Sequence, residues 1–146
     1  MAYFAEINSE NLVLRVLLAD DADCVIHGGH GSPEAAIHFT TLCPLSTNGV
    51  KWVQTFTDGT RGQHAGIGKT WNEEHQIFCE PQNYASWTLN TTTGAYEAPV
   101  AFPNIVQDGK DKLPIWDEEN QRWHHLNCDE EPPVTEIWDP NTSTWS

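Results

Sequence analysis

Four short stretches of the sequence share one pattern. In each, a large apolar residue is followed by Asn or Asp, and a large aromatic residue stands seven positions after the first. The four are Trp71-Asn72 with Phe78, Leu89-Asn90 with Tyr96, Trp116-Asp117 with Trp123, and Trp138-Asp139 with Trp145. An Asn or Asp that enters a turn accepts a hydrogen bond from the backbone two residues on, and a tight loop then returns the chain so that the flanking aromatic residues face each other. The pattern therefore predicts four hairpins, each closed by a pair of large side chains.

A helix is the alternative for two of these stretches, WNEEHQIF and WDEENQRWHHL, because Glu, Gln and Arg favour helices. Two Trp residues seven positions apart would also share one helical face. The WDPNTSTW copy does not fit this alternative, since its middle is a poor helix former. Hairpins explain all four copies and are preferred.

The first half of the chain has further β signals and one helix signal. Two β-prone runs, 3–7 and 12–18, flank a polar turn at 8–11 and predict a hairpin. Asp20–Asp23 is interpreted as an acidic loop. Ser32-Pro33-Glu34 begins a helix of about residues 33–43 that ends before Pro44, and residues 50–57 form a strand. The predicted fold is thus mainly β, made of antiparallel hairpins with aromatic clasps and one short helix that covers a sheet face.

The length of 146 residues suits one domain, 1–146, and its 15 aromatic residues can build a core. Within it, the last hairpin, 132–146, is a candidate C-terminal appendage. Four cysteines without a repeated short spacing, in a chain whose N-terminus lacks the features of a signal peptide, predict free and mostly buried thiols.

Charge excludes two classes of partner. The sequence holds 21 acidic and seven basic residues and has a formal net charge of -14, with no stretch that concentrates the basic residues. Nucleic-acid binding depends on cationic contacts to phosphate, and anionic membrane surfaces would repel such a chain. No apolar run approaches the roughly 20 residues that span a bilayer. We therefore expect neither nucleic acid nor membrane as a partner.

Two loops contain residues that resemble known sites. Gly62–Thr70 ends like a phosphate-binding loop, but Gln63 stands where that motif needs Gly, and we expect a loop that leads into the Trp71 strand. Cys24, His27 and His30 have sulfur and imidazole ligands that could bind Zn²⁺, although their spacing matches no familiar closed site. They remain weak candidates for a metal. No cofactor and no catalytic residue is predicted.

The seven tryptophans allow two interpretations. Exposed indoles could stack on sugar rings, whereas one large aromatic side chain per hairpin strand is also what core packing demands. Packing is preferred for most of them. Trp116, Trp123, Trp138 and Trp145 are nevertheless our candidates for contact with a neighbouring protein.

Five stretches follow one another along the sequence and cover most of the chain: YFAEINSENLVLRVLLAD, VKWVQTF, RGQHAGIGKTW, PQNYASWTLNTTTGAYEAPVAFP and WDEENQRW. In this order they resemble a family of small virion-associated structural proteins of marine tailed phages, including those that infect cyanobacteria. The loop at 27–31 and the C-terminal WDPNTSTW depart from the pattern. The resemblance implies a protein without catalysis, attached to a capsid as a decoration or knob or to a tail, and structural roles for Trp52, Gly66, Gly68 and Trp87.

The sequence therefore predicts an accessory structural protein, assembled in the host cytoplasm into the virion, that binds other virion proteins and associates with copies of itself. The alternative is a carbohydrate-recognition module on a tail or fibre. A metal-assisted hydrolase is a third hypothesis, and it requires a stoichiometric metal.

Overall fold

A computed structural model describes residues 1–146, and the fold is mainly β with antiparallel pairing, as predicted. The chain forms two compact units. Unit 1 comprises residues 1–81 and 89–96, and unit 2 comprises residues 82–88 and 97–146.

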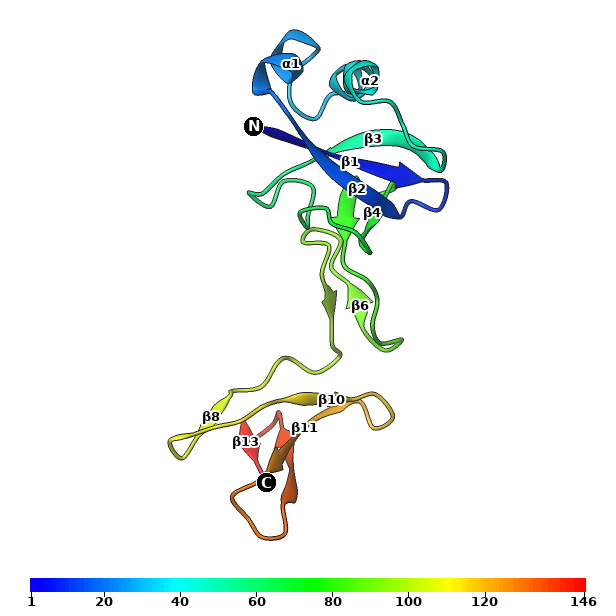
Figure 1. Ribbon diagram of the computed structural model, residues 1–146. Helices are drawn as coiled ribbons and strands as arrows, with labels where there is room; N and C mark the ends of the chain where they lie inside the picture. Colours follow the sequence, from blue (N-terminus) through cyan, green and yellow to red (C-terminus); the bar gives the residue numbers. More distant parts are fainter. The chain divides into compact units, whose positions relative to one another are not determined.

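Unit 1 is built on a three-stranded antiparallel sheet (Figure 1). Its strands are β1 (Ala2–Asn8), β2 (Val13–Ala19) and β3 (Gly49–Thr55), in the order β2-β1-β3. The β1–β2 hairpin confirms the prediction for the N-terminal segment, and β3 confirms the strand predicted at 50–57. Because β1 is the central strand, both of its edges are paired, whereas β2 and β3 are edge strands.

Two helices follow β2, where the sequence predicted only one. The predicted helix is α2 (Pro33–Leu42); the side chain of Ser32 accepts a hydrogen bond from the backbone N–H of Ala35 at 3.1 Å. The segment interpreted as an acidic loop is instead the start of a six-residue helix, α1 (Asp21–Ile26). Asp20 caps it by accepting from Ala22 N–H at 3.0 Å, and acidic residues in a first turn are favoured by the helix dipole. Neither helix has the length and apolarity of a bilayer-crossing segment.

The two faces of the unit 1 sheet are covered by different elements. On one face, α2 packs on the sheet, and Phe39 stacks on Phe4 with ring centroids 4.5 Å apart. The other face is covered by the hairpin β4 (Thr70–Asn72)–β5 (Ile77–Cys79), which contributes Trp71 and Phe78 to a second cluster. Successive side chains of a strand point to opposite faces, so β1 supplies residues to both clusters. The predicted role of the 33–43 helix is confirmed.

One charged side chain is fully buried in unit 1. Glu6 of β1 has an exposed fraction of 0% and accepts hydrogen bonds from Arg15 of β2 and from Ser46, whose backbone N–H lies 2.8 Å from the carboxylate. Burial raises the pKa of Glu6, but the hydrogen bonds from Ser46 and Arg15 outweigh burial, and its pKa lies below the ordinary value. The carboxylate thus connects the segment before β3 to the sheet.

The aromatic repeat forms the predicted hairpins. The register pairs Trp71 with Phe78 across β4–β5, and it pairs Trp116 with Trp123 between β10 (Ile115–Asp117) and β11 (Arg122–Asn127). Trp138 faces Trp145 between β12 (Val134–Asp139) and β13 (Thr144–Trp145). The fourth copy forms the two-stranded sheet of β6 (Thr88–Leu89) and β7 (Tyr96–Glu97). The helical alternative for WNEEHQIF and WDEENQRWHHL is therefore wrong.

Each of the four loops has the same two features. The Asn or Asp after the first large residue accepts a backbone N–H two or three residues on, at 2.8 to 3.2 Å. The residue two positions before the closing aromatic has a positive φ; these residues are Gln76, Gly94, Gln121 and Ser143. The loop conformation is thus shared, although only one of the four positions holds glycine.

Unit 2 consists of a four-stranded antiparallel sheet in the order β10-β11-β12-β13 and a short hairpin, β8 (Val106–Gln107)–β9 (Lys110–Asp111). The segment 132–146, the candidate appendage, supplies β12 and β13. Because β12 pairs with β11 through four residues, this segment is an integral part of the unit 2 sheet.

Position 94 requires glycine mainly because there is no room for a side chain, and less because its φ is positive. Three non-glycine residues adopt a similar φ at the matching loop position, but a Cβ on Gly94 would lie 2.0 Å from the backbone oxygen of Phe78. We expect Gly94→Ala to destabilise unit 1 by about 3 kcal/mol or more, because overpacking adds to left-handed strain. Gly59→Ala is the control: its φ is also positive, nothing lies within 4 Å, and strain alone costs about 1 kcal/mol. Urea unfolding of both variants measures the difference, and equal losses would contradict this explanation.

Glu6 makes the stability of unit 1 depend on pH. The pKa of Glu6 is lower in the folded than in the unfolded chain. Its contribution to the free energy of unfolding is therefore complete at pH values above its unfolded-state pKa of about 4.3. That contribution is lost as the pH falls through the pKa of the folded state. Glu6→Gln should lower the free energy of unfolding at pH 7 by about 1–3 kcal/mol, and the gap to wild type should shrink toward pH 3. Exposed Glu10→Gln carries the same charge change and should alter the free energy of unfolding at pH 7 by less than about 0.5 kcal/mol. A gap for Glu6→Gln that stays constant between pH 7 and pH 3 would refute this role.

Candidate functional site

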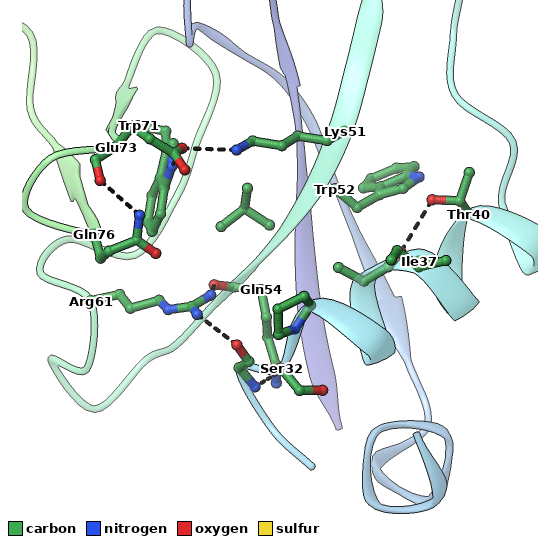
Figure 2. A pocket seen from close by; sticks show the side chains of 14 residues that line it. Ser32, Ile37, Thr40, Lys51, Trp52, Gln54, Arg61, Trp71, Glu73 and Gln76 are labelled. Atoms are coloured by element: carbon green, nitrogen blue, oxygen red, sulfur yellow. Dashed lines mark hydrogen bonds and ion pairs between the residues drawn. The ribbon is translucent and has the colours of Figure 1, made fainter. Parts of the chain in front are cut away.

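A groove of 280 Å³ lies beside β3 in unit 1, between α2 on one side and the β4–β5 hairpin on the other (Figure 2). This volume is close to the lower end of ligand pockets, roughly 300–1,000 Å³. Four consecutive residues of β3, 51–54, line the groove. Since successive side chains point to opposite faces, a run of four can line one groove only along the edge of the strand.

Each side of the groove is fixed by packing. Trp52 points toward α2, where its ring meets Phe39 edge to face at 4.9 Å and its indole N–H donates to the carbonyl of Cys43 at 2.9 Å. On the opposite side, Trp71 packs on Phe78 at 4.7 Å. Both indoles are buried by these contacts, so the groove has rigid walls.

Glu73 connects the hairpin to the edge strand. Its carboxylate accepts from Lys51 Nζ at 2.8 Å and from the Trp71 indole at 2.6 Å, and its backbone carbonyl accepts from Gln76 at 2.7 Å. The hydrogen bonds from Lys51 and then from Trp71 lower the pKa of Glu73. The carboxylate therefore stays ionised and neutralises the Lys51 charge.

Arg61 occupies the end of the groove nearest the start of α2. Its guanidinium donates to the backbone carbonyls of Gln54 at 3.0 Å and Gly31 at 2.7 Å, and it lies 5.5 Å from the centre of the Trp71 ring. Burial lowers the pKa of Arg61, and the nearby Glu73 opposes this shift. No carboxylate lies within 4.0 Å of the guanidinium, so Arg61 is a half-buried cation without an ion-pair partner.

The groove residues support binding by shape and charge. The hydroxyls of Ser32 and Thr40 donate to the backbone carbonyls of His27 and Ala36. Apolar contact area comes from Ala36, Ile37 and Val53. The polar groups of the rim thus fix the groove's own walls, while Arg61 keeps an unneutralised charge.

The weak metal candidates do not converge. Cys24 is buried, and burial is the main cause of its raised pKa. His27 stacks on His38 with ring centroids 3.6 Å apart, whereas His30 Nδ1 contacts Gln54 at 2.9 Å. No group of three or more His, Cys, Asp or Glu side chains is arranged to hold a metal ion. The four cysteines are free thiols, of which Cys24 and Cys79 are buried, Cys43 is intermediate and Cys128 is exposed.

The phosphate-loop resemblance has no structural counterpart. Residues 62–70 lead into strand β4 and not into a helix, which confirms the loop interpretation. Lys69 Nζ donates to the carbonyl of His64 at 2.9 Å and is thus bound to its own loop.

Trp116, Trp123, Trp138 and Trp145 form the core of unit 2, which corrects their selection as contact residues. Their exposed fractions are between 4 and 8%, and they cluster with Tyr84, Trp87, Ala98 and Val100. Cross-strand pairing turns these rings inward, with Trp116 and Trp123 meeting at 5.1 Å and Trp138 and Trp145 at 5.4 Å. Rings buried in this way have no area left for a neighbouring protein.

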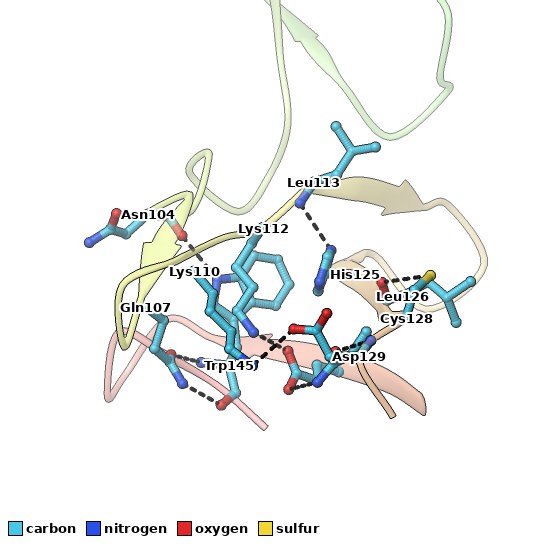
Figure 3. A network of polar contacts seen from close by, with 12 residues as sticks. Asn104, Gln107, Lys110, Lys112, Leu113, His125, Leu126, Cys128, Asp129 and Trp145 are labelled. Carbon is cyan, nitrogen blue, oxygen red and sulfur yellow. Dashed lines mark hydrogen bonds and ion pairs between the residues drawn. The ribbon is translucent and has the colours of Figure 1, made fainter. Parts of the chain in front are cut away.

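A polar network surrounds one edge of this core (Figure 3). Lys112, whose side chain is 7% exposed, forms an ion pair with Glu136 at 2.6 Å, and Lys110 pairs with Asp129 at 2.9 Å. The Trp145 indole donates to the Asn104 carbonyl at 2.9 Å. Each cation here has a carboxylate partner, so the network stabilises unit 2 and offers no free charge.

Sequence reasoning missed Arg61 and the groove. One signal was present: Lys51 and Arg61 are two of only seven basic residues, one inside the predicted Trp52 strand and the other ten positions later, in the loop that follows it. Comparison with models of known protein families, with curated proteins and with solved structures gives no match.

The burial of Trp123 in the unit 2 core can be tested by comparing it with an exposed residue of the same strand. Trp123→Ala should destabilise unit 2 by about 3–5 kcal/mol, because it leaves a large cavity. Leu126, on the same strand β11, is 47% exposed, and Leu126→Ala should cost less than about 1 kcal/mol. Urea unfolding followed by near-ultraviolet circular dichroism reports both, and similar costs would place Trp123 outside the core.

Proposed function

We propose that this protein is a non-catalytic accessory component of a tailed-phage particle that binds other virion proteins, as a capsid decoration or knob. The observation that carries the proposal is the groove along the open edge of β3. Its rim hydroxyls are engaged by the protein's own backbone, and its unneutralised cation, Arg61, offers a binding contact. This arrangement is suited to recognising a partner, which supports a binding role.

The surface chemistry supports the same role. A net charge of -14 keeps a protein soluble at high local concentration and away from the packaged nucleic acid. Small aromatic-clasped hairpins make each unit rigid, so that either unit has little conformational entropy to lose on docking. The proposal includes self-association, since soluble oligomers are most often symmetric assemblies of identical chains.

The carbohydrate-recognition alternative has weaker support. Sugar stacking needs an exposed indole face, and six of the seven tryptophans are buried, with exposed fractions of 2–8%. The seventh, Trp87, packs against Trp116 and Trp123. The indole rings therefore contribute mainly to core packing.

Attachment to particles provides the direct test. An antibody against the chain should detect it at a fixed ratio to the major capsid protein when particles of the phage that encodes it are banded in a density gradient. The added protein should also rebind particles that have been stripped by mild denaturant. A chain that stays at the top of the gradient in both experiments would refute the proposal.

A further inference from the structure

The outer edge of β3 is open to a further strand. In the sheet order β2-β1-β3, β3 pairs only with β1. The Gln54 carbonyl accepts from the Arg61 guanidinium on the groove side, and backbone groups two residues apart in a strand point to the same edge. The backbone N–H and C=O of Trp52 therefore face the groove. An extended segment placed there could form ladder hydrogen bonds, which is the general mode of strand addition.

Charge defines what kind of segment fits. Arg61 is half-buried, has no ion-pair partner and is held by two backbone carbonyls and the Trp71 ring, so its position is fixed before any partner binds. Desolvating such a cation without a counterion is unfavourable, and a carboxylate beside it would relieve this cost. Lys51, which belongs to β3 itself, is already neutralised by Glu73. The groove thus has one fixed cationic position.

We propose that this groove binds an extended acidic segment of a partner protein, which adds as a strand to the free edge of β3 and places an Asp or Glu carboxylate at Arg61. The inference deepens the proposed function and rests on it for the partner's identity as another virion protein. Apolar side chains of the segment would contact Val53 on one side and Ile37 on the other.

A second copy of this chain fits the groove less well than a different protein. Each copy carries a net charge of -14, so a second copy brings far more negative charge to this groove than one carboxylate at Arg61 requires. Self-association, which belongs to the proposed function, would therefore use a surface other than the groove. Nucleic acid is repelled by the exterior. A short acidic segment of an otherwise neutral or basic partner satisfies Arg61 without this repulsion.

The test uses a library of random eight-residue peptides displayed on yeast and selected against the full chain. We expect the selected peptides to carry Asp or Glu between β-branched residues. A synthetic peptide of the consensus should bind at least about tenfold more tightly than its Asn or Gln counterpart, with the difference reduced by salt. Bound peptide should shift the amide resonances of β3, including Trp52.

Two glutamate variants provide matched controls. Ile37 lies on the groove rim and is 68% exposed, whereas Ile67 lies outside the groove and is 83% exposed. Ile37→Glu should weaken binding of the consensus peptide at least about tenfold. Ile67→Glu introduces the same charge and should bind the peptide as tightly as wild type does. Selection of peptides without acidic residues, no selection at all, or equal loss in both variants would overturn the inference. So would a wild-type dimer that Ile37→Glu dissociates, since the occupant would then be a second copy.

Particle binding separates this inference from the proposed function. If Ile37→Glu protein still rebinds stripped particles as wild type does, the groove is not the docking site and the inference fails, while the proposed function stands. If wild-type protein selects acidic peptides but never binds particles, the groove assignment stands and the virion role fails.

Discussion

The structure depends on a loop that reverses the chain within seven residues and brings two large side chains face to face. Its geometry is set by an Asn or Asp that accepts a backbone N–H at the loop entrance and by a residue with positive φ near its exit, and all four copies share both features. A residue in the left-handed region costs roughly 1–2 kcal/mol, and pairing of the flanking aromatic residues offsets that cost. The loop and the clasp therefore support each other in the hairpins whose positive-φ residue is not glycine.

What surrounds each hairpin decides what it does. In unit 1, the β4–β5 hairpin covers the sheet that carries Ala5, Ile7 and Val53, and its Trp71 ring serves both the core and the platform under Arg61. In unit 2, two hairpins pack their tryptophans against each other and become the core itself. The same local design thus yields a wall of a groove in one unit and a closed aromatic interior in the other.

The groove exists because β3 ends the sheet. Proteins usually protect an edge strand with charge or with a covering element, and here Lys51 and Arg61 are placed along the edge while α2 and β4–β5 cover the two faces. Lys51 is paired with Glu73, so Arg61 is the one cation along this edge without an ion-pair partner. In the proposed binding mode, that single charge would favour an acidic strand over an uncharged or basic one.

The sequence by itself determined the local elements: the four clasped hairpins, the N-terminal hairpin, the capped helix at Ser32 and the strand before Asp58. These follow from signals within about ten residues, such as turn chemistry, capping and alternation, which is why they could be predicted. The six-residue α1 was missed because its short acidic run is also typical of a loop.

Only the tertiary structure decided which faces are buried. The indoles of Trp116, Trp123, Trp138 and Trp145 could have faced outward as well as inward until β12 paired with β11 and closed them into one cluster. Arg61 became a binding candidate only because residues distant in the sequence, Gly31, Gln54 and Trp71, surround its guanidinium. Such contacts depend on how the elements pack in space, and no short-range pattern in the chain encodes that packing.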